Sequence, residues 1–276
     1  MASPHIPQLE LHDGSTIDQL GLGVYKVAEE DSERVVTEAL EVGYRLIDTA
    51  SMYDNEAAVG RAVRHSGLNR EDISVATKFW LEDLGYDNTL RAFERSQEAL
   101  GLDYIDRYLI HWPAPERNLF VESWAAMLAL KNDGKVRSIG VCNFHPEHVE
   151  RLIAASGVAP AINQVEMHPW LTQERVRDFD RAHGIVSQAW SPLARGQILD
   201  EPTLVTLAAH HGRSVSQIVL RWHIQRGDAV VAKSVRRERL AENLQVFDFT
   251  LPAEDMATIE SLNRNYRTGV DPNDRN

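Results

Sequence analysis

The chain has 276 residues, of which 43% are hydrophobic and 25% are charged, a composition typical of a globular enzyme with a sizeable core. Its formal net charge of −12 argues against general binding to nucleic acids or to anionic membranes. Cys142 is the one cysteine, which excludes an intrachain disulfide and suits a reducing compartment.

The first ten residues, MASPHIPQLE, contain neither the basic start nor the apolar stretch of a signal peptide. No stretch of the sequence approaches 18 consecutive apolar residues, so no membrane span is expected. Together with the single cysteine, these observations predict a cytoplasmic protein.

In chain order, residues 9–17 come first and predict a β-hairpin around Asp13-Gly14. Short runs rich in β-branched residues then predict strands at 19–22, 46–48, 74–77, 105–110, 136–141, 161–165, 185–188 and 229–231. Segments with helical spacing lie between them, at 31–41, 56–65, 89–100, 120–133, 146–155, 174–183 and 214–225.

This regular alternation of strands and helices indicates parallel strands joined by crossover helices. Eight such units in about 250 residues favour a closed (β/α)8 TIM barrel, here with an N-terminal β-hairpin, formed by residues 1–276 as a single domain. An open doubly wound sheet is the alternative. Such a sheet normally carries the motif G-x-G-x-x-G. The motif is absent here, because Gly21-Leu22-Gly23 is followed by Val24-Tyr25-Lys26 and lacks the third glycine.

Three polar residues occupy matching places at the ends of consecutive predicted strands. Asp48 ends Leu46-Ile47-Asp48, Lys78 follows Val75-Ala76-Thr77, and His111 follows Tyr108-Leu109-Ile110. Tyr53 lies in the loop that leaves the first of these strands. Each residue alone also fits a solvated or ion-paired strand end. Their matching placement predicts a shared site at the C-terminal rim, where barrel enzymes have their active sites.

The residue types indicate what this site can do. A buried lysine needs a partner, and Asp48 is the natural one for Lys78. A cation beside a phenol favours the phenolate, so we expect a lowered pKa for Tyr53. His111 can donate a hydrogen bond to a carbonyl oxygen and orient it. The four residues predict a site that polarises and protonates an oxygen gaining negative charge.

Three segments resemble signatures of the aldo-keto reductase family, and the resemblance extends over nearly the whole chain. They are Gly43-Tyr44-Arg45-Leu46-Ile47-Asp48-Thr49-Ala50 with Tyr53, Asn55-Glu56 and Gly60; Ile139-Gly140-Val141-Cys142-Asn143-Phe144; and Lys233-Ser234-Val235-Arg236-Arg237-Glu238-Arg239 with Glu242-Asn243. The bacterial 2,5-diketo-D-gluconic acid reductases are the members that the chain resembles most.

The resemblance implies NADPH-dependent reduction of aldehydes and ketones, such as dicarbonyls and keto-sugars, to alcohols. Hydride comes from the nicotinamide, and Tyr53 acts as the general acid within a tetrad of Asp48, Tyr53, Lys78 and His111. The resemblance also favours a monomer without a metal ion.

The resemblance further implies the cofactor contacts. Cys142, Asn143 and Gln164 match the carboxamide end, Trp190 the nicotinamide face, and Ser191-Pro192-Leu193 the pyrophosphate segment. Lys233, Ser234, Val235, Arg236 and Arg239 match the pocket for the 2′-phosphate, and Glu242 and Asn243 match the adenine end. A phosphate is bound well by guanidinium groups and an ammonium, which favours NADPH over NADH. A solvated basic helix start is the alternative explanation of this cluster.

Two positions depart from the family pattern. Cys142 stands where serine is more frequent, and a thiol is the weaker hydrogen-bond partner for the carboxamide. Ala232 replaces the proline usually found before Lys233, which leaves that turn less constrained.

For the substrate side, Tyr25, Trp80 and Trp112 follow predicted strands, and together with His111 they are expected to line the pocket. Packing between loops is the alternative role of these aromatic side chains. The short, polar tail after Leu262 indicates an open pocket and broad specificity.

Two other functions fit parts of the sequence. An NADPH-binding redox sensor or regulatory subunit could use the same fold, although no additional docking segment is evident. A metal-dependent barrel hydrolase could use His111, His145, His148 and His168, but these residues show no metal-ligand spacing such as H-E-x-x-H.

Overall fold

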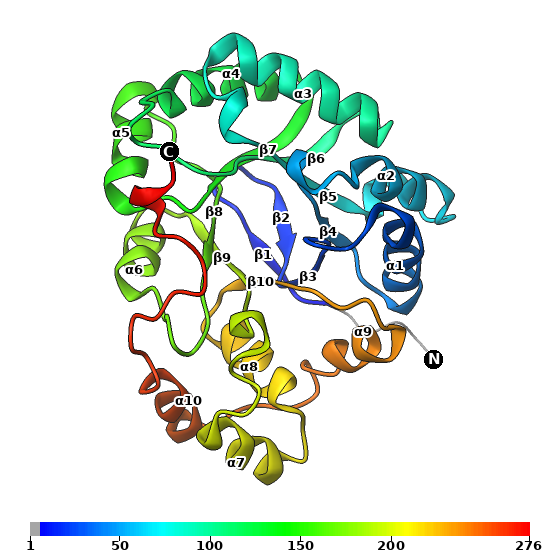
Figure 1. Cartoon of the computed structure of the whole chain (residues 1–276), viewed down its shortest axis with the longest axis vertical. Coiled ribbons are helices and arrows are strands. Elements are labelled where there is room, and N and C mark those ends of the chain that lie inside the picture. Colours follow the sequence, from blue (N-terminus) through cyan, green and yellow to red (C-terminus); the bar gives the residue numbers. More distant parts are fainter. Residues whose placement is uncertain (1–5) are drawn as a thin grey trace.

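The computed structural model describes residues 6–276 and contains a closed barrel of parallel strands (Figure 1). The strands follow the order β10-β3-β4-β5-β6-β7-β8-β9 around the barrel. Their bounds are β3 Leu20–Gly23, β4 Leu46–Asp48, β5 Ser74–Phe79, β6 Ile105–Ile110, β7 Val136–Cys142, β8 Ile162–Glu166, β9 Val186–Trp190 and β10 Ala229–Ala232.

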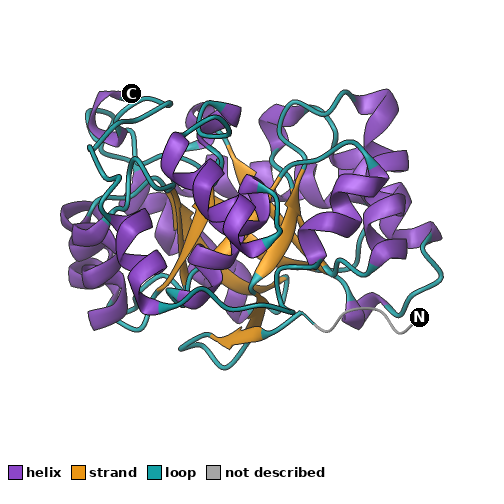
Figure 2. Ribbon diagram, turned by 90° about the horizontal axis from the view of Figure 1, so that it is seen from below, coloured by secondary structure: helices purple, strands orange, loops and turns teal. Residues whose placement is uncertain are grey.

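A separate antiparallel hairpin, β1 (Gln8–Glu10) and β2 (Thr16–Asp18), lies across one end of the barrel (Figure 2). The chain passes from β2 directly into β3, so this is the end at which the barrel strands begin. The prediction of a (β/α)8 barrel with an N-terminal hairpin is confirmed. Half of the segment tested for a signal peptide, residues 1–5, lies outside the described residues.

Helices surround the barrel and cover the outer face of its strands (Figure 1). Their bounds are α1 Glu29–Val42, α2 Glu56–His65, α3 Tyr86–Leu100, α4 Phe120–Asn132, α5 Pro146–Ser156, α6 Glu174–Ala182, α7 Pro202–His211, α8 Val215–Gln225, α9 Arg237–Leu244 and α10 Ala253–Glu260.

Local sequence explains where several helices begin. Helix α1 has Glu29, Glu30 and Asp31 in its first turn, where carboxylates stabilise the positive end of the helix dipole. Helix α8 starts with a capping box in which Ser214 and Gln217 satisfy each other's backbone N–H groups. These signals fix the ends of the elements that connect successive strands.

The structure differs from the sequence-based prediction mainly at element ends. Strand β5 continues to Phe79, so Lys78 lies within a strand and not after it. Strand β9 runs to Trp190, which makes that residue its last member. Helices α7, α9 and α10 were not among the predicted helical segments. Helix α7 is an additional helix between β9 and β10, and α9 and α10 follow the last barrel strand.

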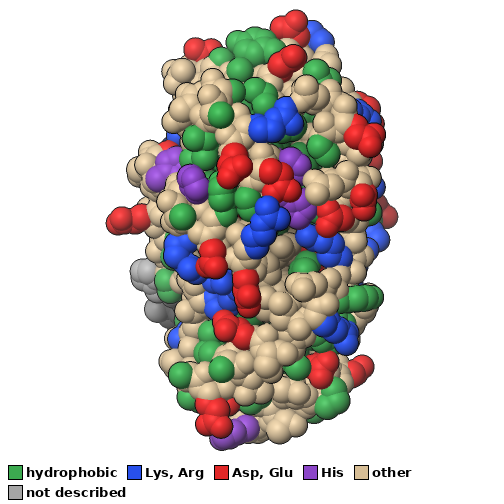
Figure 3. Space-filling model, turned by 90° about the vertical axis from the view of Figure 1, so that its left-hand side faces the viewer, with side chains coloured by type: hydrophobic (Ala, Val, Ile, Leu, Met, Phe, Trp, Pro, Cys, Tyr) green, Lys and Arg blue, Asp and Glu red, His purple; other side chains and the backbone are tan. Residues whose placement is uncertain are grey.

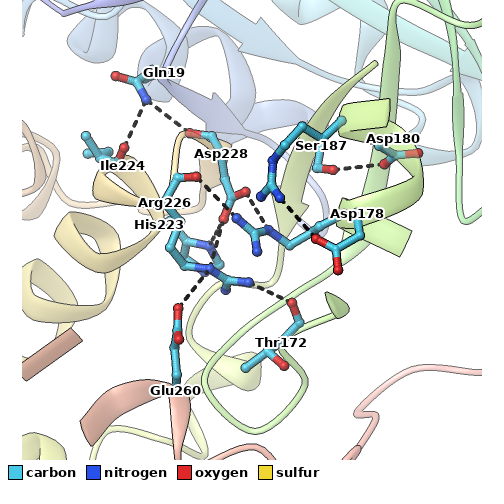
Figure 4. Close-up of polar contacts among 12 residues, drawn as sticks. Gln19, Thr172, Asp178, Asp180, Ser187, His223, Ile224, Arg226, Asp228 and Glu260 are labelled. Atoms are coloured by element: carbon cyan, nitrogen blue, oxygen red, sulfur yellow. Dashed lines mark hydrogen bonds and ion pairs between the residues drawn. The ribbon is translucent and has the colours of Figure 1, made fainter. Parts of the chain in front are cut away.

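A buried polar network ties α6 and α8 to the hairpin end of the barrel (Figure 4). Asp228, just before β10, accepts a hydrogen bond from Arg177 Nε at 2.8 Å and lies 3.4 Å from Nδ1 of His223. Beside it, the Ser187 hydroxyl donates to Asp180 at 2.8 Å. These bonds satisfy charges that would otherwise be costly to bury.

The outer surface is mixed in charge where Figure 3 shows it, with acidic and basic side chains interspersed among small apolar areas. Within residues 6–276, no helix combines the length and apolar character needed to cross a bilayer.

Candidate active site

The end of the barrel opposite the hairpin brings together the residues predicted to be catalytic. Asp48 ends β4, Lys78 lies near the end of β5, and His111 follows β6. These strands are neighbours, with Asp48 paired to Ala76 and Lys78 to Leu109. Parallel register therefore places all three side chains at one rim.

Asp48 and Lys78 form a buried ion pair. Lys78 Nζ donates to Asp48 Oδ2 and to the backbone oxygen of Thr49, both at 2.7 Å. The side chain of Lys78 is 0% exposed and that of Asp48 is 5% exposed. Burial alone would lower the pKa of Lys78, but the Asp48 carboxylate raises it above its usual value. Lys78 is thus a fixed cation at the barrel mouth.

Tyr53 reaches the same place from the short 3-10 helix Ser51–Tyr53 that follows β4. Its ring centroid lies 5.3 Å from Lys78 Nζ and 5.8 Å from the His111 ring, which it meets edge-on. Buried Asn55 holds this loop, since it donates to the backbone oxygen of Val24 at 3.1 Å and accepts from Thr49 at 2.6 Å. The four predicted catalytic residues therefore lie together.

The expected lowering of the Tyr53 pKa is wrong for the protein alone. Burial raises the pKa of this phenol above its usual value, and Lys78 offsets only part of that rise. Desolvation penalises the phenolate more than one nearby ammonium stabilises it. Tyr53 consequently carries its proton at neutral pH and is able to donate it.

His111 is neutral for related reasons. Burial, followed by the charges of Lys78 and Arg275, keeps its pKa well below the usual value. Its ring Nδ1 is buried and has no partner within the described residues. A neutral imidazole retains one N–H donor and one acceptor, so it can orient a carbonyl without adding a second positive charge.

The residues predicted to hold the carboxamide end of a cofactor lie beside the pair of Asp48 and Lys78, with Asn143 directly after β7, Gln164 within β8 and Trp190 at the end of β9. Gln164 Nε2 donates to Asp48 Oδ1 and to Gln188, both at 2.8 Å. Asn143 donates to the backbone oxygen of His111 at 3.0 Å and accepts from Trp190 Nε1 at 2.8 Å. One hydrogen-bonded network thus connects the predicted cofactor contacts to the predicted catalytic residues.

Cys142 lies next to Gln164 in this network. Its Sγ lies 3.7 Å from Gln164 Oε1. Burial raises the pKa of the thiol above its usual value, which disfavours the reactive thiolate. The side chain contributes a weak hydrogen bond and packing.

The next segment leaves β9 along the rim. Ser191 has a φ of 53°, and its hydroxyl accepts from the Arg195 backbone N–H at 3.1 Å. Leu193 follows and precedes another short 3-10 helix. The predicted pyrophosphate segment is therefore a tight turn at the mouth of the barrel.

A cationic segment follows β10, where the pocket for a 2′-phosphate was predicted. It comprises Lys233, Ser234, Val235, Arg236 and Arg239, the last of them on α9. Lys233 Nζ donates to the backbone oxygen of Lys26 at 2.9 Å. Burial and then the nearby Lys26 ammonium lower the pKa of Lys233. Two ammonium groups near each other fit an anion such as a phosphate.

Other members of this signature have different surroundings. Arg237 pairs with Glu41 on α1. The backbone oxygen of Glu242 accepts from Gln217 at 3.0 Å, and buried Asn243 hydrogen-bonds to Tyr44. The last two therefore help to fix α9 against its neighbours.

The predicted substrate residues surround the same mouth. The Tyr25 ring lies 5.0 Å from the Tyr53 ring, and the Trp80 ring meets His111 edge-on at 4.9 Å. Trp112 is 9% exposed.

The short tail after Leu262 led us to expect an open pocket. In the structure, the chain after α10 instead reaches the aromatic residues at the barrel mouth. It returns along α6 toward α5 (Figure 1) and brings Arg275 to 5.1 Å from the Trp80 ring and 5.6 Å from the Trp112 ring. The place of Arg275 could not be predicted from the sequence, because no local pattern shows where an irregular tail folds.

A second cavity and two further histidines lie outside this site. A cavity of about 670 Å³ lies at the hairpin end, where Arg70 and Arg137 pair with Asp106. Among residues 6–276, no three His, Cys, Asp or Glu side chains gather as metal ligands. His145 instead pairs with Asp271, and His168 pairs with Glu166.

Comparisons with known proteins identify the family to which the chain is similar. The profile of the Aldo/keto reductase family matches residues 18–264. An aldo-keto reductase of Mycolicibacterium smegmatis is 50% identical over 266 residues, which cover 96% of this chain and 97% of the relative.

Among solved structures, an aldo/keto reductase from Brucella melitensis has a TM-score of 0.91 at 47% identity, covering 94% of this chain and 100% of that chain. A variant of the protein Gox0644 in complex with NADPH has a TM-score of 0.94 at 43% identity, covering 98% of each chain.

Proposed function

The chain belongs to the aldo/keto reductase family, and from this we propose that it reduces aldehydes and ketones with NADPH, with Tyr53 as the proton donor. The observation that carries the proposal is the arrangement of Tyr53 beside the buried pair of Lys78 and Asp48. Within the family, we propose dicarbonyls and keto-sugars as the first substrates to test, as for the 2,5-diketo-D-gluconic acid reductases.

Bound NADPH supplies the hydride, and the protein supplies orientation and the proton. As negative charge develops on the carbonyl oxygen, the Tyr53 hydroxyl donates its proton to that oxygen. The resulting phenolate is stabilised by the Lys78 ammonium, which Asp48 holds in place. The neutral imidazole of His111 orients the carbonyl oxygen toward Tyr53.

The assignment of NADPH as the cofactor rests on the cationic segment after β10 and on a similar protein that was solved with NADPH. Lys233, Arg236 and Arg239 provide an ammonium and two guanidinium groups, the donors that suit a 2′-phosphate. The Gox0644 variant was solved with NADPH. Asn143 and Gln164 would hold the carboxamide, Trp190 would stack on the ring, and Ser191 and Leu193 would line the pyrophosphate. We further propose that residues 1–276 act as one catalytic domain, in a monomer in the cytoplasm.

The proposal is tested by following NADPH absorbance with a panel of aldehydes, dicarbonyls and keto-sugars. Carbonyl-dependent oxidation of NADPH supports the reductase. Tight binding of NADPH without turnover on any member of the panel would favour the regulatory subunit instead. Absence of both binding and turnover would remove the cofactor assignment.

A further inference from the structure

The tail after α10 is fixed across the barrel mouth at two places. Glu166, at the end of β8, accepts from the backbone N–H groups of Thr268 and Gly269 at 2.6 and 3.0 Å. Further along, Asp271 lies 3.2 Å from His145 Nε2 and 3.1 Å from Arg267 Nε. These bonds direct the chain from β8 to the start of α5.

The end of the tail is anchored on the other side of the pocket. Pro272 is buried, and the Asn276 side chain accepts from the backbone N–H of Glu116 at 2.8 Å. Glu116 lies in the loop that carries Trp112. Arg275 is therefore held between fixed points, and its place over the pocket does not depend on its own side-chain contacts.

Arg275 is surrounded by aromatic rings and not by carboxylates. Its guanidinium faces two indole rings, at 5.1 and 5.6 Å, and its Nε is buried without a hydrogen-bond partner. No ion pair formed within residues 6–276 includes it, whereas Arg267 in the same tail pairs with Asp271. Arg264 also faces two aromatic rings, Trp170 and Tyr266, but these lie away from the predicted catalytic residues. Aromatic faces stabilise a guanidinium but leave its in-plane N–H donors free.

Arg275 lies near enough to the predicted catalytic residues for its charge to act on His111. Trp80 contacts both Arg275 and His111, the latter at 4.9 Å, so one small molecule can reach from the imidazole to the guanidinium. We propose that Arg275 determines substrate specificity by binding a carboxylate, so that the preferred substrates are small aldehydes or ketones that carry a carboxylate a few bonds from the carbonyl. This inference rests on the proposed reductase function.

The chemistry of the site supports a carboxylate. A planar guanidinium offers paired N–H donors that match the two carboxylate oxygens. The neighbouring indole rings are apolar, which strengthens a charge-assisted bond beside them and suits the apolar part of a substrate. A protein with a net charge of −12 otherwise repels anions, so an unpaired cation at the mouth has a specific effect on which substrates enter.

The test compares 4-carboxybenzaldehyde with its methyl ester, which has nearly the same shape without the charge. We expect the wild type to prefer the acid. Arg275→Gln should reduce kcat/KM for the acid by about tenfold or more, mainly through KM, and change the ester by less than about threefold. Arg275→Lys should retain part of the preference, since it keeps the charge but loses the paired donors.

Arg175→Gln is the matched control, because Arg175 is an exposed arginine on α6 that pairs only with Glu147 in the described residues. It should leave the preference unchanged. An equal loss for acid and ester in Arg275→Gln would overturn the proposal and show that Arg275 only packs the tail. An unchanged preference in Arg275→Gln would overturn it as well.

A binding measurement separates this proposal from the reductase assignment. Calorimetry with benzoate and benzamide, with and without NADP⁺, requires no turnover. Benzoate should bind the wild type more tightly than benzamide, and Arg275→Gln should remove the difference. If neither aldehyde is reduced but this difference is present, the reductase function fails while the carboxylate site stands. Equal benzoate binding by wild type and Arg275→Gln would overturn the site.

Discussion

Lys78 Nζ and Asp48 Oδ2 lie 2.7 Å apart with both side chains almost completely removed from solvent. A buried pair of this kind is costly to break from one side, because the remaining charge loses its partner. The same pair positions the cation beside Tyr53, so its removal has consequences for both stability and catalysis.

Lys78→Met and Asp48→Asn should each lower the free energy of unfolding by about 3 kcal/mol. The double variant removes both charges and should recover part of that loss, because no unpaired charge remains. Urea unfolding of the three variants measures this coupling, and turnover should be low in all three. Losses that simply add in the double variant would show that the two groups do not depend on each other.

Lys233→Met and Arg239→Gln should weaken NADPH binding by about tenfold each while leaving NADH binding nearly unchanged, since only NADPH carries the 2′-phosphate. Fluorescence titration with both cofactors measures this. Arg237→Gln is the control, because Arg237 belongs to the same segment but pairs with Glu41. Equal weakening of both cofactors, or an equal effect of the control, would contradict the phosphate assignment.

Asp180 should make stability decrease with increasing pH. Burial raises its pKa to about 7, although Ser187 and Asn163 donate hydrogen bonds to it. A carboxyl group with a raised pKa favours the folded state below its unfolded-state pKa, and this contribution is lost as the pH rises through the folded-state value. In Figure 4, Asp180 faces Ser187 at the start of β9.

Asp180→Asn removes this titration and keeps the hydrogen-bonding shape. The difference in free energy of unfolding between variant and wild type should shift in favour of the variant by about 2 kcal/mol from pH 5 to pH 8. Denaturant unfolding at the two pH values measures it. A difference that stays constant with pH would show that Asp180 is not protonated near neutrality in the folded protein.

Gly60 should not tolerate a side chain. A Cβ at this position would lie 1.9 Å from the backbone oxygen of Leu100, where α2 and α3 approach each other. Gly60→Ala must separate the two helices and should cost about 1–3 kcal/mol in thermal or urea unfolding. At Gly23, by contrast, the nearest atom is Val231 Cβ at 3.7 Å. Gly23→Ala should cost clearly less, and equal losses would contradict the packing argument.

Sequence alone predicted the barrel because short segments that become buried strands, such as β6 and β8, alternate regularly with segments of helical spacing. The placement of Asp48, Lys78 and His111 was predictable because parallel strands repeat at nearly equal intervals. Helix α7 was not predictable in this way. It is one of two helices between β9 and β10, whereas the regular barrel pattern has a single helix between successive strands.

Two properties of the site needed the three-dimensional structure. The pKa of Tyr53 depends on a balance between burial and the Lys78 charge, and residue types reveal only the charge. The position of Arg275 depends on how the tail folds over Glu166 and Asp271, and an irregular segment has no periodicity that reports it.

The most direct test of the central claim is turnover by Tyr53→Phe, measured as carbonyl-dependent NADPH oxidation beside the dissociation constant for NADPH. The account predicts a loss in kcat of about 100-fold or more, with NADPH binding retained, because the hydroxyl is needed only to protonate the carbonyl oxygen. Turnover close to that of the wild type would show that another group donates the proton and would contradict the account.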